Sequence, residues 1–245
     1  MAKYEGLLDF RVRWFPFQLN PLASYEGENK LQMYNDKFGP GRVAQMIPMM
    51  TRTYAEEGLP PYNMDGLTGN TLNSHRLLLW AAEAHGLQAQ NRLVDELFKG
   101  LGLAGPWWVR PPGPGGCGGW GLGYFTGARF INDRAFLLEA AAAAGLPSDA
   151  AAKVLDDPES YLEETQQELR RYPGVTGVPH FVIRAAGDQR PLARLGGAQP
   201  PEEFQEVFEG IVARAQPGGP GAKAAAAPAG ADGAACGVGG GGGAC

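Results

Sequence analysis

The fold is decided by residues 174–183, GVTGVPHFVI, which read as a loop, a proline and a short buried strand. Phe181, Val182 and Ile183 are aromatic or β-branched, which is the composition of a strand packed on both faces. Pro179 stands at the start of this strand, where its missing N–H removes no bond from a sheet. The cis form of a peptide bond is least unfavourable before a proline. The residues therefore allow two interpretations, a trans proline that opens a strand and a cis proline that fixes a ligand-facing loop.

Further stretches accompany this one in order along the chain. They are WFPFQLNP at 14–21, NTLNSHR at 70–76, FIND at 130–133 and LGGAQP at 195–200, followed by a final amphipathic helix. Together they resemble the DsbA family of thioredoxin-fold proteins, and more narrowly its FrnE-like branch. That branch is related to 2-hydroxychromene-2-carboxylate isomerase and kappa-class glutathione transferase. The resemblance covers most of residues 4–215. It implies an α/β fold, thioredoxin-like with an inserted all-helical domain, in which a cis Pro179 faces an active-site Cys-x-x-Cys.

The sequence departs from that family at the active site, because it contains no Cys-x-x-Cys motif. Its three cysteines are Cys117, which lies among glycines, and Cys236 and Cys245 near the C-terminus. None has histidine or cysteine at zinc-site spacing, so no metal site is predicted. An odd number of cysteines also argues against a disulfide-stapled secreted fold. We interpret all three as incidental thiols and predict no catalytic residue in this sequence.

Composition excludes some other classes of function. The formal net charge of the 245 residues is −5, which gives no basic surface for nucleic acid. The sequence shows no charged-then-apolar leader and no apolar run long enough to cross a bilayer. We therefore expect a cytoplasmic protein with neither a membrane partner nor a cofactor. Targeting to an organelle by a signal on a lost N-terminus is an alternative. The oligomeric state is not predicted.

Residues 9–17, DFRVRWFPF, predict a half-buried strand, with Phe10, Val12, Trp14 and Pro16 on one face and Asp9, Arg11, Arg13 and Phe15 on the other. In the resembled family this is the second strand of the sheet. Its first strand, its Cys-x-x-Cys and most of its first helix would precede Met1. We therefore expect a fold whose first strand is missing, in which 9–17 lacks its parallel neighbour, and we interpret the sequence as truncated.

Residues 29–172 have a helical pattern and form the predicted insert. The candidate helices are 29–38, 42–57, 71–85, 88–99, 133–144, 148–155 and 159–172, with glycine and proline between several of them. Residues 101–123 interrupt the pattern, because glycine and proline dominate them and no periodicity remains. A retained intron or gene-model error is the interpretation that we favour, and a surface loop is the alternative.

Residues 1–28 and 173–215 make up the predicted thioredoxin-like part. After the Pro179 strand, 185–189 predict a hairpin turn and 192–195 a return strand. Residues 201–215 then predict a helix that begins with proline and two acidic residues and carries an apolar stripe. The Gly/Ala tail, 216–245, has too few large apolar residues to fold and is predicted to be disordered.

Disulfide exchange requires a cysteine thiolate, which the resembled family supplies beside the proline loop. Here the loop is present without that nucleophile. Val178 and Pro179 are predicted to present a backbone edge to an extended thiol or disulfide peptide or to glutathione. His180 follows them and either lines the same groove or points to solvent.

Three further residues are weaker candidates for substrate binding. His75 lies on an apolar helix face, where a histidine is more often a satisfied core residue than a catalyst. Gln199 is expected to fix the turn into the last helix, with substrate contact as the alternative. Phe17 ends the predicted strand 9–17.

The resemblance implies a thiol–disulfide oxidoreductase, with little or no activity in this chain because the nucleophile is absent. One alternative is a glutathione-dependent isomerase or transferase of the kappa type, which uses a serine at the missing position. The other is a non-catalytic peptide-binding or chaperone module.

Overall fold

The computed structural model describes residues 2–56, 62, 64–100, 129–188 and 190–215. The predictions for 101–123, for the tail 216–245 and for the three cysteines lie outside this part of the chain. The elements, in chain order, are η1 (Ala2–Tyr4), β1 (Glu28–Asn29), α1 (Lys30–Phe38), α2 (Pro40–Glu56), β2 (Leu67–Thr68), α3 (Leu72–His85), α4 (Leu87–Gly100), α5 (Arg134–Ala143), α6 (Ser148–Asp156), α7 (Leu162–Arg170), β3 (His180–Ile183), β4 (Ala193–Gly196) and α8 (Pro201–Ala215).

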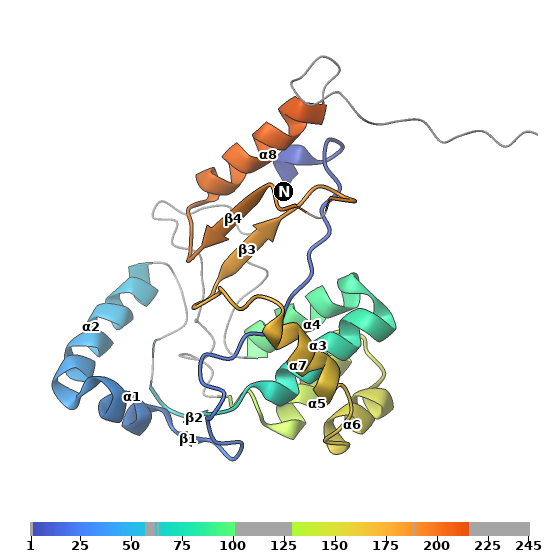
Figure 1. Cartoon of the computed structure of the whole chain (residues 1–245). Helices are drawn as coiled ribbons and strands as arrows, with labels where there is room; N and C mark the ends of the chain where they lie inside the picture. Colours follow the sequence, from blue (N-terminus) through green and yellow to red (C-terminus); the bar gives the residue numbers. More distant parts are fainter. Residues whose placement is uncertain (1, 57–61, 63, 101–128, 189, 216–245) are drawn as a thin grey trace, which may run out of the picture.

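The main hydrophobic core lies within the helices α3 to α6, against which α7 also packs, at one end of the molecule (Figure 1). Its fully buried members come from four helices and include Leu77, Ala81, Leu93, Leu137, Ala141 and Ala151. The helices α1 and α2 pair beside this bundle, while the β3–β4 hairpin and α8 lie at the other end (Figure 1). None of the helices in the described part of the chain has the length and apolar character needed to span a membrane.

The predicted helices are confirmed, and all but one have both ends within two residues of the prediction. The exception is α7, which begins at Leu162 rather than at residue 159. Asp157 is extended, as expected for a residue before proline, and Tyr161 adopts a left-handed φ of 56°. These two residues break the helical path, so the chain turns before α7 starts.

The bundle is also held by one buried cation. Arg76 of α3 is only 3% exposed, and it donates to the carbonyl oxygens of Ser160 (2.7 Å), Val154 (2.7 Å) and Asp157. It also donates to Oδ1 of Asn73 at 2.9 Å. Carbonyl groups at the end of α6 and in the following turn thus receive donors from α3, which fixes the connection between α6 and α7.

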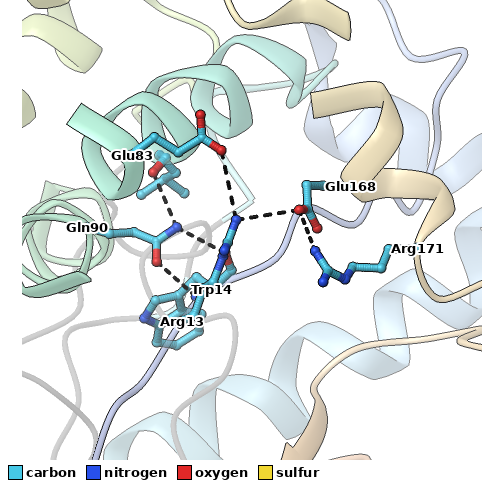
Figure 2. Close-up of polar contacts among 7 residues, drawn as sticks. Arg13, Trp14, Glu83, Gln90, Glu168 and Arg171 are labelled. Carbon is cyan, nitrogen blue, oxygen red and sulfur yellow. Dashed lines mark hydrogen bonds and ion pairs between the residues drawn. The ribbon is translucent and has the colours of Figure 1, made fainter. Parts of the chain in front are cut away.

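The prediction of a strand at residues 9–17 is wrong, because no ladder partner lies beside this segment in the described residues. Exposure alternates as predicted over residues 9–14, whereas residues 15–17 are all half-buried. Its backbone is bound by α4: Gln90 accepts from the Trp14 N–H and donates to the Trp14 carbonyl, both at 3.0 Å (Figure 2). Asn91 donates to the carbonyl of Val12 at 3.3 Å. Side-chain amides therefore take the place of a neighbouring strand.

The C-terminal hairpin is confirmed with its return strand shifted by one residue. Phe181 pairs with Leu195 and Val182 with Arg194 in an antiparallel register. The ring centroids of Phe181 and Phe204 of α8 lie 4.9 Å apart, so α8 covers the face of the hairpin that carries Phe181.

The N-terminal segment packs against the outer part of α8. The rings of Tyr4 and Phe10 both meet Phe208 edge-on, at centroid distances of 5.5 and 5.0 Å. Lys3 adds an exposed ion pair to Glu209 at 2.7 Å. The first and last described elements are therefore in direct contact.

A short pairing of β1 with β2 was not predicted. Glu28 pairs with Thr68 and Asn29 with Leu67. Each strand has only two residues, which is too few to show the alternation of apolar and polar side chains that predicts a strand. The pairing holds the chain before α1 close to the chain before α3.

Candidate substrate-binding site

The start of β3 forms the most exposed part of the predicted site. Val178 is 47% exposed, and the Val178–Pro179 peptide bond is cis. The Pro179 carbonyl accepts from the N–H of Gly197 at 2.8 Å. Gly197 has a φ of +81°, which favours glycine at this position. The end of β4 thus fixes the position of the loop that carries Val178.

Gln199 lies in the turn between β4 and α8. Its Nε2 donates to the carbonyl of Gly196 at 2.6 Å. The amide nitrogen is therefore engaged by the chain's own backbone, which agrees with a turn-fixing role. Its role in substrate contact stays a prediction.

A pocket of about 310 Å³ lies next to the Pro179 loop. Its lining residues come from the end of α7, the following loop and the β3–β4 hairpin, and they are Arg171, Tyr172, Pro173, Gly174, Val175, His180 and Arg194. No acidic residue is among them. His180 thus faces a groove rather than open solvent alone, and its Nε2 is shielded from water without a hydrogen-bond partner in the described structure.

Arg171 is held at the pocket by a group of charged and aromatic side chains. Glu168 accepts from Arg171 at 2.6 Å and from Arg13 at 3.4 Å, and Arg13 also lies 4.0 Å from Glu83 (Figure 2). The ring centroid of Phe15 is 5.4 Å from the guanidinium carbon of Arg171 and 5.1 Å from that of Arg13. Both guanidinium groups are thus fixed by an ion pair and a ring.

Glu168 lies between Arg13 and Arg171 and is mostly buried. Its side chain is only 14% exposed, because two guanidinium groups enclose it. One weak signal for this arrangement is present in the sequence, namely the aromatic Phe15 at a position of residues 9–17 whose preceding neighbours on the same face are polar. Arg13 and Glu168 are 155 residues apart in the sequence, so local sequence patterns cannot predict that they pair.

His75 and Phe17 are brought together, away from the hydrogen bonds of the Pro179 loop. Nε2 of His75 lies 3.1 Å from the Phe17 carbonyl oxygen, so the imidazole donates to it as Nε2–H. Burial lowers the pKa of His75 to about 4, and the bond to the carbonyl only partly offsets this effect. The ring is therefore neutral near pH 7. These contacts agree with the interpretation of His75 as a satisfied core residue.

Comparison with known proteins agrees with this geometry. Residues 123–209 match the model of the DSBA-like thioredoxin domain, a range that holds the Pro179 loop, the pocket-lining residues and most of α8. The chain has a DsbA-like thioredoxin fold. A crystal structure described as that of a probable DsbA oxidoreductase from Streptomyces coelicolor is similar over 80% of this chain and 73% of that chain. The identity is 28% and the TM-score 0.57. No curated protein matches the chain.

The predicted α/β, thioredoxin-like fold with added helices is thereby confirmed. Sequence reasoning did not find Arg171, Tyr172 and Arg194 as parts of the site. Arg194 lies on a strand of four residues and is paired across from Val182, so only the register places it beside His180. The sequence of one strand does not by itself predict which residue of the other strand pairs with a given position.

Proposed function

We propose that this chain binds thiol and disulfide substrates of the kind on which DsbA-type oxidoreductases act, and that Val178, Pro179 and His180 contact the substrate. The observation that carries this proposal is the position of an exposed Val178, next to a pocket, within the range that matches the DSBA-like thioredoxin domain. An extended thiol peptide or glutathione placed along this edge would bind through backbone groups. The helices between β1 and β3 support a place in the FrnE-like branch.

The chemistry of thiol–disulfide exchange limits the activity that this chain can have. A thiolate must attack a disulfide sulfur, form a mixed disulfide and be displaced by a second thiolate. The printed sequence has no Cys-x-x-Cys to supply that pair of sulfurs. We therefore propose that this chain binds the thiol substrate and exchanges disulfides weakly or not at all.

Binding is tested with a neutral, acetylated and amidated peptide that contains S-methylcysteine, titrated into the full chain by calorimetry or NMR. The variant Val178→Glu should weaken binding about tenfold, because it places a charge where apolar and backbone contacts are expected. The matched control is Leu22→Glu, since Leu22 is 94% exposed and is not among the pocket-lining residues. Equal affinity of the two variants would contradict the proposed site.

Exchange is tested separately, by reduction of insulin disulfides with a thiol donor. The expected rate is that of the donor alone. A rate that exceeds this background and disappears in the Cys117→Ser, Cys236→Ser, Cys245→Ser triple variant would contradict the proposed lack of exchange. Glutathione conjugation of 1-chloro-2,4-dinitrobenzene by the chain would instead favour the kappa-type alternative. Peptide binding without either activity is the result expected of a binding module.

A further inference from the structure

The pocket beside Pro179 carries a second, more specific inference. We propose that it binds the carboxylate group of a short peptide thiol, with Arg194 as the main cation. The inference rests on the proposed function for the thiol part of the ligand. Its main cation, Arg194, is not among the residues proposed there to bind the substrate, whereas His180 belongs to both sets. Charge, preorganisation and an unpartnered polar atom each support it.

The first support is the charge of the lining. Two arginines and a histidine line the pocket, and no aspartate or glutamate does. Arg194 has no ion pair within the described residues, so its guanidinium is available to a ligand. A guanidinium donates two parallel N–H groups to a carboxylate, and this geometry is poorly matched by neutral ligands.

The second support is the fixed position of Arg171. Glu168 accepts from its Nη1 at 2.6 Å, and the ring of Phe15 lies against its guanidinium carbon. A ligand would therefore lose less conformational freedom of this side chain than it would at a mobile arginine. Glu168 is shared with Arg13, so its charge does not fully neutralise Arg171. The remaining N–H groups of Arg171 can serve a second carboxylate.

The third support is His180. Its Nε2 is shielded from water and has no hydrogen-bond partner in the described structure. A buried polar atom without a partner is uncommon and calls for an explanation such as a bound ligand. The imidazole lines the pocket, so an acceptor oxygen there can supply the missing bond once the ring rotates to turn Nε2 toward it. A carboxylate has two such oxygens, one of which would remain for Arg194.

The size and place of the pocket define the ligand class. A volume of about 310 Å³ lies at the lower end for small-molecule sites, so it fits a terminal residue rather than a long chain. His180 follows Pro179 directly, so a ligand whose backbone lies at Val178 reaches the pocket within one or two residues. The ligand is therefore a peptide thiol with a free carboxylate near its sulfur, either glutathione or the C-terminus of a longer peptide.

The test uses S-methylglutathione, which cannot exchange disulfides, titrated into the full chain by calorimetry or NMR. We expect Arg194→Gln to weaken binding about tenfold and Arg194→Lys to weaken it less. The matched control is Arg184→Gln, which removes one exposed positive charge of the same hairpin region from outside the pocket lining. The diethyl ester of S-methylglutathione should bind the wild-type chain about as weakly as the acid binds Arg194→Gln. Far-UV circular dichroism of each variant checks that it is folded.

Equal effects of Arg194→Gln and Arg184→Gln, or equal affinities of acid and ester, would overturn the inference. A peptide of six residues with S-methylcysteine near a free or an amidated C-terminus separates the two carboxylate sources. Preference for the free terminus extends the inference to longer peptides, and binding of the tripeptide alone restricts it to glutathione. The neutral peptide used for Val178 carries no carboxylate, so the proposed function can fail while this inference holds, and the reverse.

Discussion

Gln90 of α4 binds the backbone of Trp14 with a single side chain, and its removal gives a quantitative test of the fold. The residue is 1% exposed on α4. Its amide makes bonds of 3.0 Å to both the N–H and the carbonyl of Trp14, and one of 3.2 Å to the carbonyl of Leu78. The substitution Gln90→Leu keeps a similar volume and removes all three bonds. Backbone groups of Trp14 then lose their partners on α4.

The expected loss follows from these contacts. Each bond contributes about 0.5–1.5 kcal/mol, and a buried group left without a partner costs about 1–3 kcal/mol. The leucine side chain offsets part of this loss of stability, because it buries additional apolar area. We therefore expect Gln90→Leu to lower the free energy of unfolding by about 3 kcal/mol.

The assay is urea unfolding followed by far-UV circular dichroism, which reports the helices. The matched control is Gln88→Leu, an identical change at an exposed position of the same helix. This control should change the free energy of unfolding by less than about 0.5 kcal/mol. A Gln90→Leu variant as stable as Gln88→Leu would refute the idea that the amide holds residues 9–17.

Two further predictions concern stability. The pKa of His75 is about 4 in the folded chain, so the unfolded chain binds the extra proton, and stability should fall by about 3 kcal/mol as pH drops from about 6.5 to 4. His75→Gln should flatten this pH dependence of urea unfolding, and an unchanged pH dependence in this variant would contradict the argument from burial. Gly69→Ala should destabilise by more than about 2 kcal/mol, because its Cβ would lie near the Ser24 carbonyl oxygen, while Gly41→Ala, with open space around it, should not; thermal melts that rank them equally would contradict this steric argument.

Local sequence patterns were sufficient to predict the helices and the C-terminal hairpin. The apolar stripe of α8 and the caps of α5 act within one turn, as when Asp133 accepts from the N–H of Phe136 at 2.6 Å. The run Phe181 to Ile183 likewise shows its strand through composition alone. Contacts of this kind depend on neighbours in sequence, so they are visible without a structure.

Residues 9–17 show why the rest was not predictable. The alternation of apolar and polar side chains correctly gives the buried side, but a strand also requires a partner for its backbone, which no sequence pattern supplies. The pocket could not be predicted from the sequence for a similar reason. Arg171 and Arg194 come from segments that only the folded chain brings together, and each is an ordinary surface arginine by its local sequence.

The contact between the N-terminal segment and α8 links the two ends of the described chain. Tyr4 and Phe10 cover the ring of Phe208, and the hydroxyl of Tyr4 donates to the carbonyl of Gln205 at 3.2 Å. Fraying of residues 4–10 therefore uncovers α8, and detachment of α8 removes the packing partner of residues 4–10. We expect the two ends to open as one cooperative unit, so a protease that cuts near residue 7 should also loosen the helix that covers the hairpin beside the proposed site.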